Sequence, residues 1–324
     1  LILPGGDRKT RPERSIKASG GSAQRQILRA GAAEDEWPRT RARATLRPRP
    51  PAKAGLDDHH GEEELDIATL FDVRGKRALV TGGSGGIGYM IAEGLVSAGV
   101  EVWVCSRKEA DIQAAAEKLS ALGTAHAIAA DLSGEEGLQK VADELNAAGP
   151  LHILVNNAGA TWGAKLEGFP RKGFEKVMNL NVTAPFELTK LLLPALRAAA
   201  TREDPARVIN IASIDGLKVP RWESYPYSAS KAGIIHLSRH MGKFLAAEDV
   251  SVNVIAPGFF PSKMTAAVVD FDDAEAMDAV ASPLGHRAGR PEDIAAGVIY
   301  LSSRAGAWLS GVVLPISGGM ATLD

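Results

Sequence analysis

Two kinds of apolar pattern alternate along the chain from residue 73 onward. Short apolar runs that end at glycine or polar residues are typical of buried strands, and longer segments with apolar residues at helical spacing are typical of helices. The pattern predicts strands at 78–80, 100–104, 127–130, 153–155, 207–211, 252–255 and 312–316. It predicts helices at 86–98, 109–122, 135–148, 174–199, 227–248 and 291–303. This alternation predicts an α/β fold, a doubly wound parallel seven-stranded sheet with helices on both faces.

Special residues follow the predicted strands. They are Thr81-Gly82, Cys105-Ser106-Arg107, Asp131, Asn156-Asn157, Ser213 and Pro257-Gly258. In doubly wound sheets, ligands bind beyond the carboxyl ends of the strands. We therefore expect all of these residues at one rim of the sheet.

Residues 1–66 differ from residues 67–324, which form the single predicted domain. The first segment is rich in arginine and proline, and its sparse apolar residues show no period. Such a segment cannot bury enough surface to offset its ordering entropy, so we predict a disordered extension. An arginine-rich organelle-targeting leader is the alternative, although Glu34, Asp35 and Glu36 argue against it. A nucleic-acid-binding arm is the weakest interpretation, and Leu1 in place of Met leaves the natural start open.

Overall composition excludes several classes of protein. The formal net charge is −2, which gives no argument for a nucleic-acid partner. Cys105 is the single cysteine, so no disulfide can form within the chain and a reducing, cytoplasmic location is expected. No apolar run approaches the roughly 20 residues that a membrane span requires.

A glycine-rich turn connects the first predicted strand to the first predicted helix, from Thr81 to Gly88. Its spacing is G-x-x-x-G-x-G, with Gly82, Gly86 and Gly88. Glycines there permit a tight turn and close approach of the backbone to a pyrophosphate, which the helix N-terminus attracts. The turn therefore predicts a dinucleotide site.

The end of the second strand indicates which dinucleotide is bound. An enzyme that uses NAD places an acid there for the ribose 2′-OH, but here Arg107 and Lys108 precede the first acid, Glu109. A guanidinium suits a phosphate, so NADP(H) is favoured over NAD(H). Asp131 could accept a hydrogen bond from the adenine amine or cap the helix that starts near Ser133.

Tyr227 and Lys231 are four residues apart on a predicted helix, and hence on one face of it. A lysine ammonium beside a phenol lowers the tyrosine pKa, which makes a proton donor usable near neutral pH. By itself this spacing is more often an exposed tyrosine and a solvated lysine. The surrounding motifs favour the catalytic interpretation. Tyr225 is the rival phenol, but it has no lysine four residues later.

With these motifs, the stretch from about Phe71 to Gly319 resembles the single-domain short-chain dehydrogenase/reductases, which have a Rossmann fold. The matching residues are Thr81-Gly82, Gly86-Ile87-Gly88, Asn156-Asn157-Ala158-Gly159, Asn181, Ser213, Tyr227, Lys231 and Pro257-Gly258. The segments 154–163 and 253–262 resemble those of 3-oxoacyl reductases linked to rhamnolipid synthesis. Two departures are His152, where the family usually has Asp, and Ser262, where it often has Thr.

The resemblance implies a role for each matching residue. Tyr227 would be the general acid in reduction and the base in oxidation, Lys231 would lower its pKa, and Ser213 would steady the substrate oxygen. Asn181, preferred over Asn179, would hold a water that links Lys231 to solvent. The implied cofactor-binding residues are Thr81, Gly82, Ser84, Gly86, Ile87, Gly88, Arg107, Asp131, Leu132, Asn157, Ala158, Gly159, Tyr227, Lys231, Pro257, Gly258 and Ser262, and no metal is implied.

The substrate is expected to be a small carbonyl or alcohol. Residues 259–290 could form an apolar lid, with Trp162 and Trp222 as walls, or a capping helix packed on its own core. An acidic carrier protein would need basic residues, which Arg197, Arg202 and Arg207 could supply near Glu248-Asp249.

The leading hypothesis is an NADP(H)-dependent reductase of a 3-oxoacyl or similar ketone. The alternatives are a sugar, polyol or other secondary-alcohol dehydrogenase and a non-catalytic dinucleotide-binding protein. The resemblance also implies a homo-oligomer, a tetramer or dimer, that pairs through helices 174–199 and 227–248.

Overall fold

The computed structural model describes residues 66–266, 273, 278 and 280–322. The predicted disordered extension lies outside the described residues except at its last residue, so the domain division at 66/67 stays a prediction. Four apolar residues of the predicted lid, Val268, Val269, Phe271 and Met277, also lie outside them.

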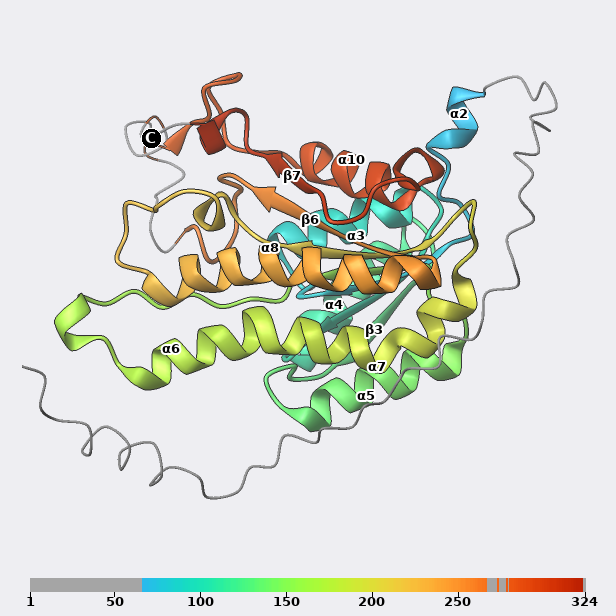
Figure 1. Ribbon diagram of the computed structural model, residues 1–324, viewed down its shortest axis with the longest axis horizontal. Helices are drawn as coiled ribbons and strands as arrows, with labels where there is room; N and C mark the ends of the chain where they lie inside the picture. Colours follow the sequence, from blue (N-terminus) through green and yellow to red (C-terminus); the bar gives the residue numbers. More distant parts are fainter. Residues whose placement is uncertain (1–65, 267–272, 274–277, 279, 323–324) are drawn as a thin grey trace, which may run out of the picture. The chain divides into compact units, whose positions relative to one another are not determined.

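Seven parallel strands form one sheet in the described part of the chain, in the order β3-β2-β1-β4-β5-β6-β7 (Figure 1). Their bounds are β1 Arg77–Thr81, β2 Glu101–Ser106, β3 Ala125–Ala129, β4 Ile153–Asn156, β5 Ala206–Ile211, β6 Val250–Pro257 and β7 Val313–Ile316. The order reverses direction between β1 and β4, as in doubly wound sheets. The predicted fold class is confirmed.

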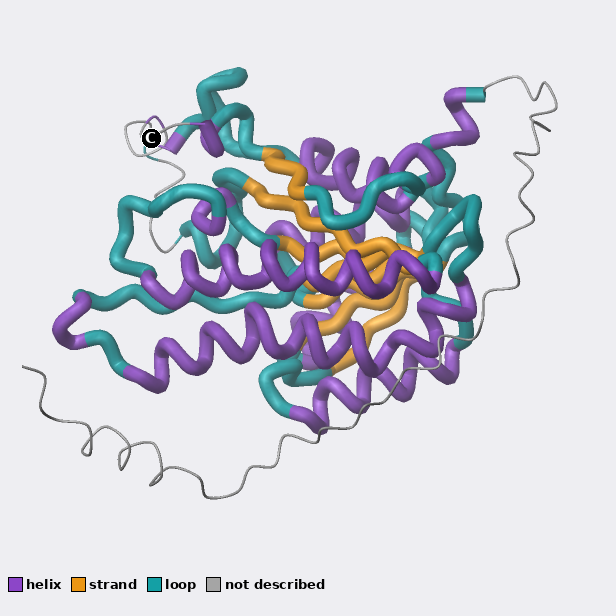
Figure 2. The backbone as a smooth tube through the Cα atoms, viewed as in Figure 1, coloured by secondary structure: helices purple, strands orange, loops and turns teal. Residues whose placement is uncertain are grey.

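Helices cover both faces of this sheet, and the strands lie between them (Figure 2). Alternate residues of β1 explain the two layers, because side chains along a strand point to opposite faces. Ala78 and Val80 pack with helices α3 (Gly86–Ser97), α4 (Glu109–Ser120) and α10 (Pro291–Ser302). Leu79 packs with α5 (Glu135–Ala148) and α7 (Ala184–Ala199), and Met241 of α8 (Tyr225–Leu245) contacts the same cluster. A short helix, α2 (Ile67–Leu70), precedes the sheet.

Several element boundaries differ from the predictions. The residues predicted to follow strands include Thr81, Cys105, Ser106, Asn156 and Pro257, but these lie within the strands, at their carboxyl ends. The parallel ladder extends over them, for example where Thr81 pairs with Cys105, so the strands reach further toward the rim.

The predicted long helix at 174–199 is also divided. It consists of α6 (Arg171–Met178), a π-helical turn over Asn179–Thr183, and α7. The predicted helix at 227–248 starts two residues earlier, at Tyr225, and its α-helical part ends at Leu245. A 3-10 turn, Ala246–Glu248, then leads to Asp249, whose φ of 57° turns the chain into β6. No helix in the described part of the chain has the length and apolar content to cross a membrane.

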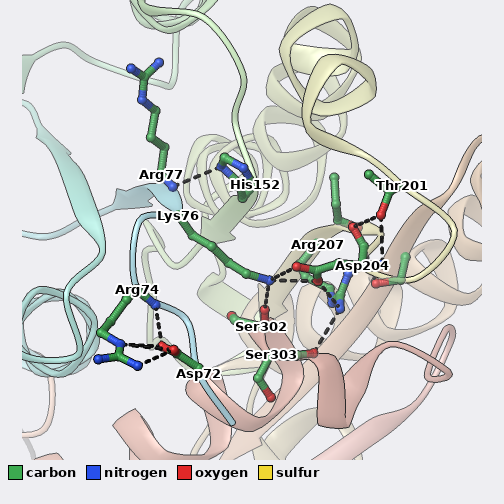
Figure 3. A network of polar contacts seen from close by, with 12 residues as sticks. Asp72, Arg74, Lys76, Arg77, His152, Thr201, Asp204, Arg207, Ser302 and Ser303 are labelled. Carbon is green, nitrogen blue, oxygen red and sulfur yellow. Dashed lines mark hydrogen bonds and ion pairs between the residues drawn. The ribbon is translucent and has the colours of Figure 1, made fainter. Parts of the chain in front are cut away.

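The amino-terminal rim of the sheet holds a buried polar network (Figure 3). Lys76 Nζ donates to Asp204 Oδ1 at 2.8 Å and to the carbonyl of Ser302 at 2.9 Å. Arg207, with 0% exposure, donates to Asp204 Oδ1 at 3.1 Å and to the carbonyls of Leu301 and Ser303, both at 2.9 Å. The two cations therefore cap the carboxyl end of α10, where carbonyl groups lack helical partners.

This network corrects one expectation. Arg207 was a candidate for binding an acidic carrier, but it is enclosed in the core because β5 carries it beneath α10. Arg197 forms an ion pair with Glu248, which also removes it from a free basic surface. His152 has a structural contact: its Nδ1 accepts a hydrogen bond of 3.1 Å from the Arg77 backbone N–H (Figure 3). Burial lowers the pKa of His152, which keeps the ring neutral and able to accept.

Candidate active site

The turn after β5 places Ser213 against α8. The Asp215 N–H donates to Ser213 Oγ at 3.1 Å at the start of a 3-10 turn, Ile214–Gly216. A Cβ on Gly216 would lie 2.6 Å from the carbonyl carbon of Lys231, so only glycine allows this approach. A backbone N–H can only donate, and Ser213 Oγ must accept from it. The Ser213 O–H is thereby left to donate elsewhere.

Tyr227 lies within reach of that hydroxyl. Burial raises the pKa of Tyr227 to about 12, and the negative charge of Asp215 adds to this, while a hydrogen bond from Ser213 acts in the opposite direction. The free protein thus does not have the lowered tyrosine pKa that the sequence predicts. Desolvation disfavours the phenolate more than the surrounding donors favour it. The phenol therefore keeps its proton at neutral pH.

Lys231 lies on the same face of α8 as Tyr227, as predicted. Its Nζ donates to the carbonyl of Ile211 at 2.8 Å and lies 5.4 Å from the centre of the Tyr227 ring. Burial lowers the pKa of Lys231 to about 8, and the Asp215 charge opposes this shift. Near neutral pH the site therefore holds a protonated lysine next to a protonated phenol.

Asn181 connects the loop after β4 to α8. Its Oδ1 accepts from the Ala160 N–H at 2.8 Å, and its Nδ2 donates to the Ala160 carbonyl and to Ser230 Oγ, both at 2.9 Å. Asn181 is 3% exposed and Asn179 is half-buried, and both belong to the π-helical turn. Asn179, the alternative to Asn181, donates from its Nδ2 to the Ser133 carbonyl at 2.8 Å, away from α8.

Tyr225, the rival phenol, has other partners. Its hydroxyl donates to Glu223 Oε1 at 2.9 Å, and its ring contacts Phe169 edge-on with centres 5.9 Å apart. It is exposed at the first residue of α8.

The glycine-rich turn forms a tight cradle between β1 and α3. Gly82 has φ 70°, and a Cβ on Gly88 would lie 2.3 Å from the Gly82 carbonyl oxygen. Thr81 Oγ1 accepts from the N–H groups of Asn157 and Ala158, both at 2.9 Å, and so ties the ends of β1 and β4 together. This geometry fits a pyrophosphate that approaches the backbone closely.

A cavity of about 350 Å³ adjoins this cradle. Among the predicted cofactor residues, seven line it: Gly82, Ser84, Arg107, Asp131, Leu132, Ala158 and Gly159. Asp131 Oδ1 accepts from the N–H of Ser133 at 3.0 Å and from its hydroxyl at 2.8 Å, so it caps the turn before α5. Burial would raise the pKa of Asp131, but these hydrogen bonds and the Arg107 charge outweigh it and lower the pKa.

The glycine-rich cradle, Ser213, Tyr227 and Lys231 all lie within one stretch that matches a known family. The family model for short chain dehydrogenases matches residues 76–273. The chain belongs to the short-chain dehydrogenase family. This dehydrogenase is 49% identical, over 250 residues, to a rhamnolipids biosynthesis 3-oxoacyl-[acyl-carrier-protein] reductase of Pseudomonas aeruginosa, a match that covers 77% of this chain and 97% of the relative. It is 32% identical over 257 residues to gluconate 5-dehydrogenase of Gluconobacter oxydans, covering 78% of this chain and 96% of that protein.

Solved structures agree with this assignment. A Pseudomonas aeruginosa RhlG/NADP active-site complex matches this dehydrogenase with a TM-score of 0.75 and 48% identity, over 78% of this chain and 99% of that one. A Burkholderia cenocepacia gluconate 5-dehydrogenase in complex with NADP and tartrate matches with a TM-score of 0.71 and 28% identity, over 79% of this chain and 99% of that one.

Other predicted cofactor residues are not among those that line the cavity. The Gly258 N–H donates to the Ile316 carbonyl at 2.9 Å, so Pro257-Gly258 joins β6 to β7. Ser262 lies against the cradle, since a Cβ on Gly86 would come within 2.9 Å of Ser262 Cβ. Sequence reasoning did not assign a cofactor role to Lys108, Asp111, Leu180 or Lys263, which also line the cavity. Lys263 directly follows Ser262, but no motif in the sequence indicates how far its side chain reaches.

Proposed function

We propose that the protein uses NADPH to reduce the ketone of a 3-oxoacyl or similar carbonyl substrate to a secondary alcohol. The observation that carries this proposal is the convergence of Ser213, Tyr227 and Lys231 on one face of α8, at the rim where the glycine cradle opens. The 49% identity to a 3-oxoacyl reductase supports the substrate class.

The cavity and its charges support NADP(H). Arg107 and Lys108 lie where an acid would bind the ribose of NAD, and both line the cavity. Gly82, Gly86 and Gly88 permit the tight turn that leads to the N-terminus of α3, where free N–H groups would bind a pyrophosphate. When bound, the nicotinamide would supply the hydride.

The chain's own residues would donate the proton and stabilise the negative charge that develops on the substrate oxygen. Ser213 accepts from the Asp215 N–H, and its O–H, which donates to Tyr227 in the free protein, would turn to the substrate oxygen, where negative charge develops. Tyr227 holds its proton at neutral pH and would donate it to that oxygen as the general acid. Lys231, protonated below about pH 8, would stabilise the phenolate that remains. Asn181, whose side chain is held by Ala160 and Ser230, would position a water that links Lys231 to solvent, and the replacement proton would arrive through that water.

Apolar side chains near the site favour an acyl chain. Leu217, Val219 and Trp222 are exposed on the segment between the Ser213 turn and α8. Trp162, the other predicted wall, packs on Gly173 of α6. Exposed apolar side chains beside a reacting centre suit a substrate that carries a hydrocarbon tail.

An assay with NADPH and a panel of acetoacetyl esters, diketones and keto-sugars tests the proposal. We expect turnover of the acetoacetyl esters. The second candidate, a sugar or polyol dehydrogenase, is supported by the identity to gluconate 5-dehydrogenase. Turnover of a polyol with NADP⁺, together with no turnover of any ketone, would replace the first candidate by the second. If no compound reacts but NADPH still binds, the protein is a non-catalytic dinucleotide-binding protein.

Cofactor preference has its own test. Arg107→Asp places an acid at the end of β2, and we expect the preference for NADPH to move toward NADH. An unchanged ratio of the two affinities would remove Arg107 from the cofactor site.

Pairing of copies through α7 and α8 completes the proposal. Phe186 on α7 and Phe244 on α8 are exposed, and large apolar residues on helix faces are typical of subunit contacts. Light scattering should give the molar mass of a dimer or tetramer. Phe244→Glu should lower the molar mass of the assembly in solution. A monomer in the unmodified protein would contradict this assembly.

A further inference from the structure

Lys263 lies far along the chain from Arg107 and Lys108, but its side chain lines the same cavity. It follows β6, whereas Arg107 and Lys108 follow β2, and three strands separate β6 from β2 in the sheet. At the usual strand spacing this is a distance of about 19 Å. Lys263 Nζ nevertheless lies 3.9 Å from Asp111 Oδ2 in the first turn of α4. The segment after β6 therefore crosses above the carboxyl ends of the intervening strands.

The backbone on each side of Lys263 is firmly held. The Ser262 N–H donates to Thr265 Oγ1 at 2.8 Å, and the Thr265 N–H donates back to Ser262 Oγ at 3.1 Å. Phe260 is 2% exposed and anchors the segment in the core. The Lys263 side chain extends into solvent, with 95% exposure. The backbone of Lys263 is therefore fixed beside the cavity, and its side chain extends from that fixed point to Asp111.

The charges that line the cavity explain the contact with Asp111. Three cations, Arg107, Lys108 and Lys263, and two carboxylates, Asp111 and Asp131, face it. Asp131 is occupied by the two hydrogen bonds from Ser133, whereas Asp111 faces Lys263. An exposed ion pair at 3.9 Å contributes little, so a stronger anion can displace Asp111 from Lys263.

The geometry points to Lys263 as a third cation for the 2′-phosphate of NADP(H), with Asp111 as its exchangeable partner when no phosphate is present. This inference rests on the proposed use of NADP(H) and adds a residue and an exchange to it. A phosphate monoester carries about −1.5 to −2 charges at neutral pH and offers three acceptor oxygens. It would bind beside Arg107 and Lys108, next to the first turn of α4 that carries Asp111. Lys263 would then move from a carboxylate to a more highly charged anion a short distance away.

Asp111 has a second effect in this arrangement. A carboxylate close to the bound phosphate repels it, so Asp111 weakens the binding of NADP(H) in two ways: it competes for Lys263 and it opposes the phosphate charge. NADH carries a neutral hydroxyl at the 2′ position, so neither effect should change its affinity. Lys263 and Asp111 therefore act in opposite directions on the same cofactor preference.

Calorimetric titration of the full chain with NADPH and with NADH tests this inference. For Lys263→Gln we expect a roughly five- to tenfold higher Kd for NADPH, because one charge-assisted contact is lost, and an unchanged Kd for NADH. For Asp111→Asn we expect a roughly two- to fivefold lower Kd for NADPH, again with NADH unchanged. Lys118→Gln, the same charge change at the other end of α4, is the matched control and should change neither value.

Two fragments locate the contact. Adenosine 2′,5′-bisphosphate should lose affinity in Lys263→Gln, and ADP should not. Equal losses for NADPH and NADH would place Lys263 on the shared pyrophosphate and overturn the inference, as would no loss for either. A selective loss of NADPH binding in Arg107→Asp, combined with no change in Lys263→Gln, would leave the proposed function standing and remove Lys263 alone. An unmodified protein that prefers NADH would contradict the proposed function itself.

Discussion

Lys231 Nζ lies 5.4 Å from the centre of the Tyr227 ring, and its hydrogen bond goes to the Ile211 carbonyl at 2.8 Å. The ammonium is therefore anchored to the end of β5 and positioned beside the phenol. Burial favours the neutral form of each group. It therefore raises the pKa of Tyr227 to about 12 and lowers the pKa of Lys231 to about 8. Below about pH 8 the site holds a proton on each group, which is the state that reduction of a ketone requires.

Removal of the Tyr227 hydroxyl should abolish turnover without affecting cofactor binding. For Tyr227→Phe we expect kcat for ketone reduction to fall by about 10³-fold, because a positioned general acid is lost. The Kd for NADPH, measured by titration, should not change. Tyr225→Phe is the matched control, since Tyr225 donates to Glu223 and should keep full activity. Full activity in Tyr227→Phe would reassign the acid.

Asp215 should set the pH range of the reaction. Its negative charge raises the pKa of both Tyr227 and Lys231, so Asp215→Asn should lower both. We expect the profile of alcohol oxidation, recorded between about pH 6 and about pH 10, to move toward lower pH, because the phenol loses its proton more readily. Asp215→Glu retains the charge, and Glu223→Gln removes a charge beside Tyr225; both should keep the original profile. A profile that stays in place or moves upward would show that Asp215 does not act through charge.

Lys231 should reduce stability at neutral pH. Its pKa is about 8 in the folded protein against an ordinary value of 10.5, so the unfolded chain binds more protons between these values. The free energy of unfolding therefore rises with pH across that window. Lys231→Met lacks this titration and does not gain this stability as pH rises. The unfolding free energy of the variant minus that of the unmodified protein should therefore decrease by about 3 kcal/mol between about pH 7 and about pH 10.5.

Urea unfolding at several pH values measures this difference. Lys243→Met, an exposed lysine of the same helix, is the control and should show a constant difference. A constant difference for Lys231→Met as well would mean that burial does not penalise its charge.

Asp204 should contribute strongly to the stability of the protein through the polar network at the amino-terminal rim of the sheet. It is the carboxylate between Lys76 and Arg207, and Asp204→Asn leaves two buried cations without their counter-charge (Figure 3). We expect a loss of about 3 kcal/mol in unfolding free energy. Asp72→Asn removes the carboxylate of an exposed pair with Arg74 and should leave stability unchanged. Similar results for the two variants would mean that the buried network contributes no more than a surface pair.

Many of these features were accessible from the sequence because they depend on local pattern. The order of strands and helices follows from apolar periodicity, and the bounds of α5 agree residue for residue with the prediction at 135–148. The spacing of Tyr227 and Lys231 placed both on one helix face, which the structure confirms. The π-helical turn at Asn181 was not predicted, because the flanking residues have ordinary helical periodicity and the turn is stabilised by partners on other elements, Ala160 and Ser230.

The sequence by itself determined the layers of the fold and which residue types stand at the rim, since these follow from periodicity and from spacing within single elements. Tertiary structure alone decided the protonation of Tyr227, the burial of Arg207 and the reach of Lys263 to Asp111. Each of these depends on desolvation or on distances between segments that are far apart in the chain. Such quantities are set by packing, which no local pattern encodes.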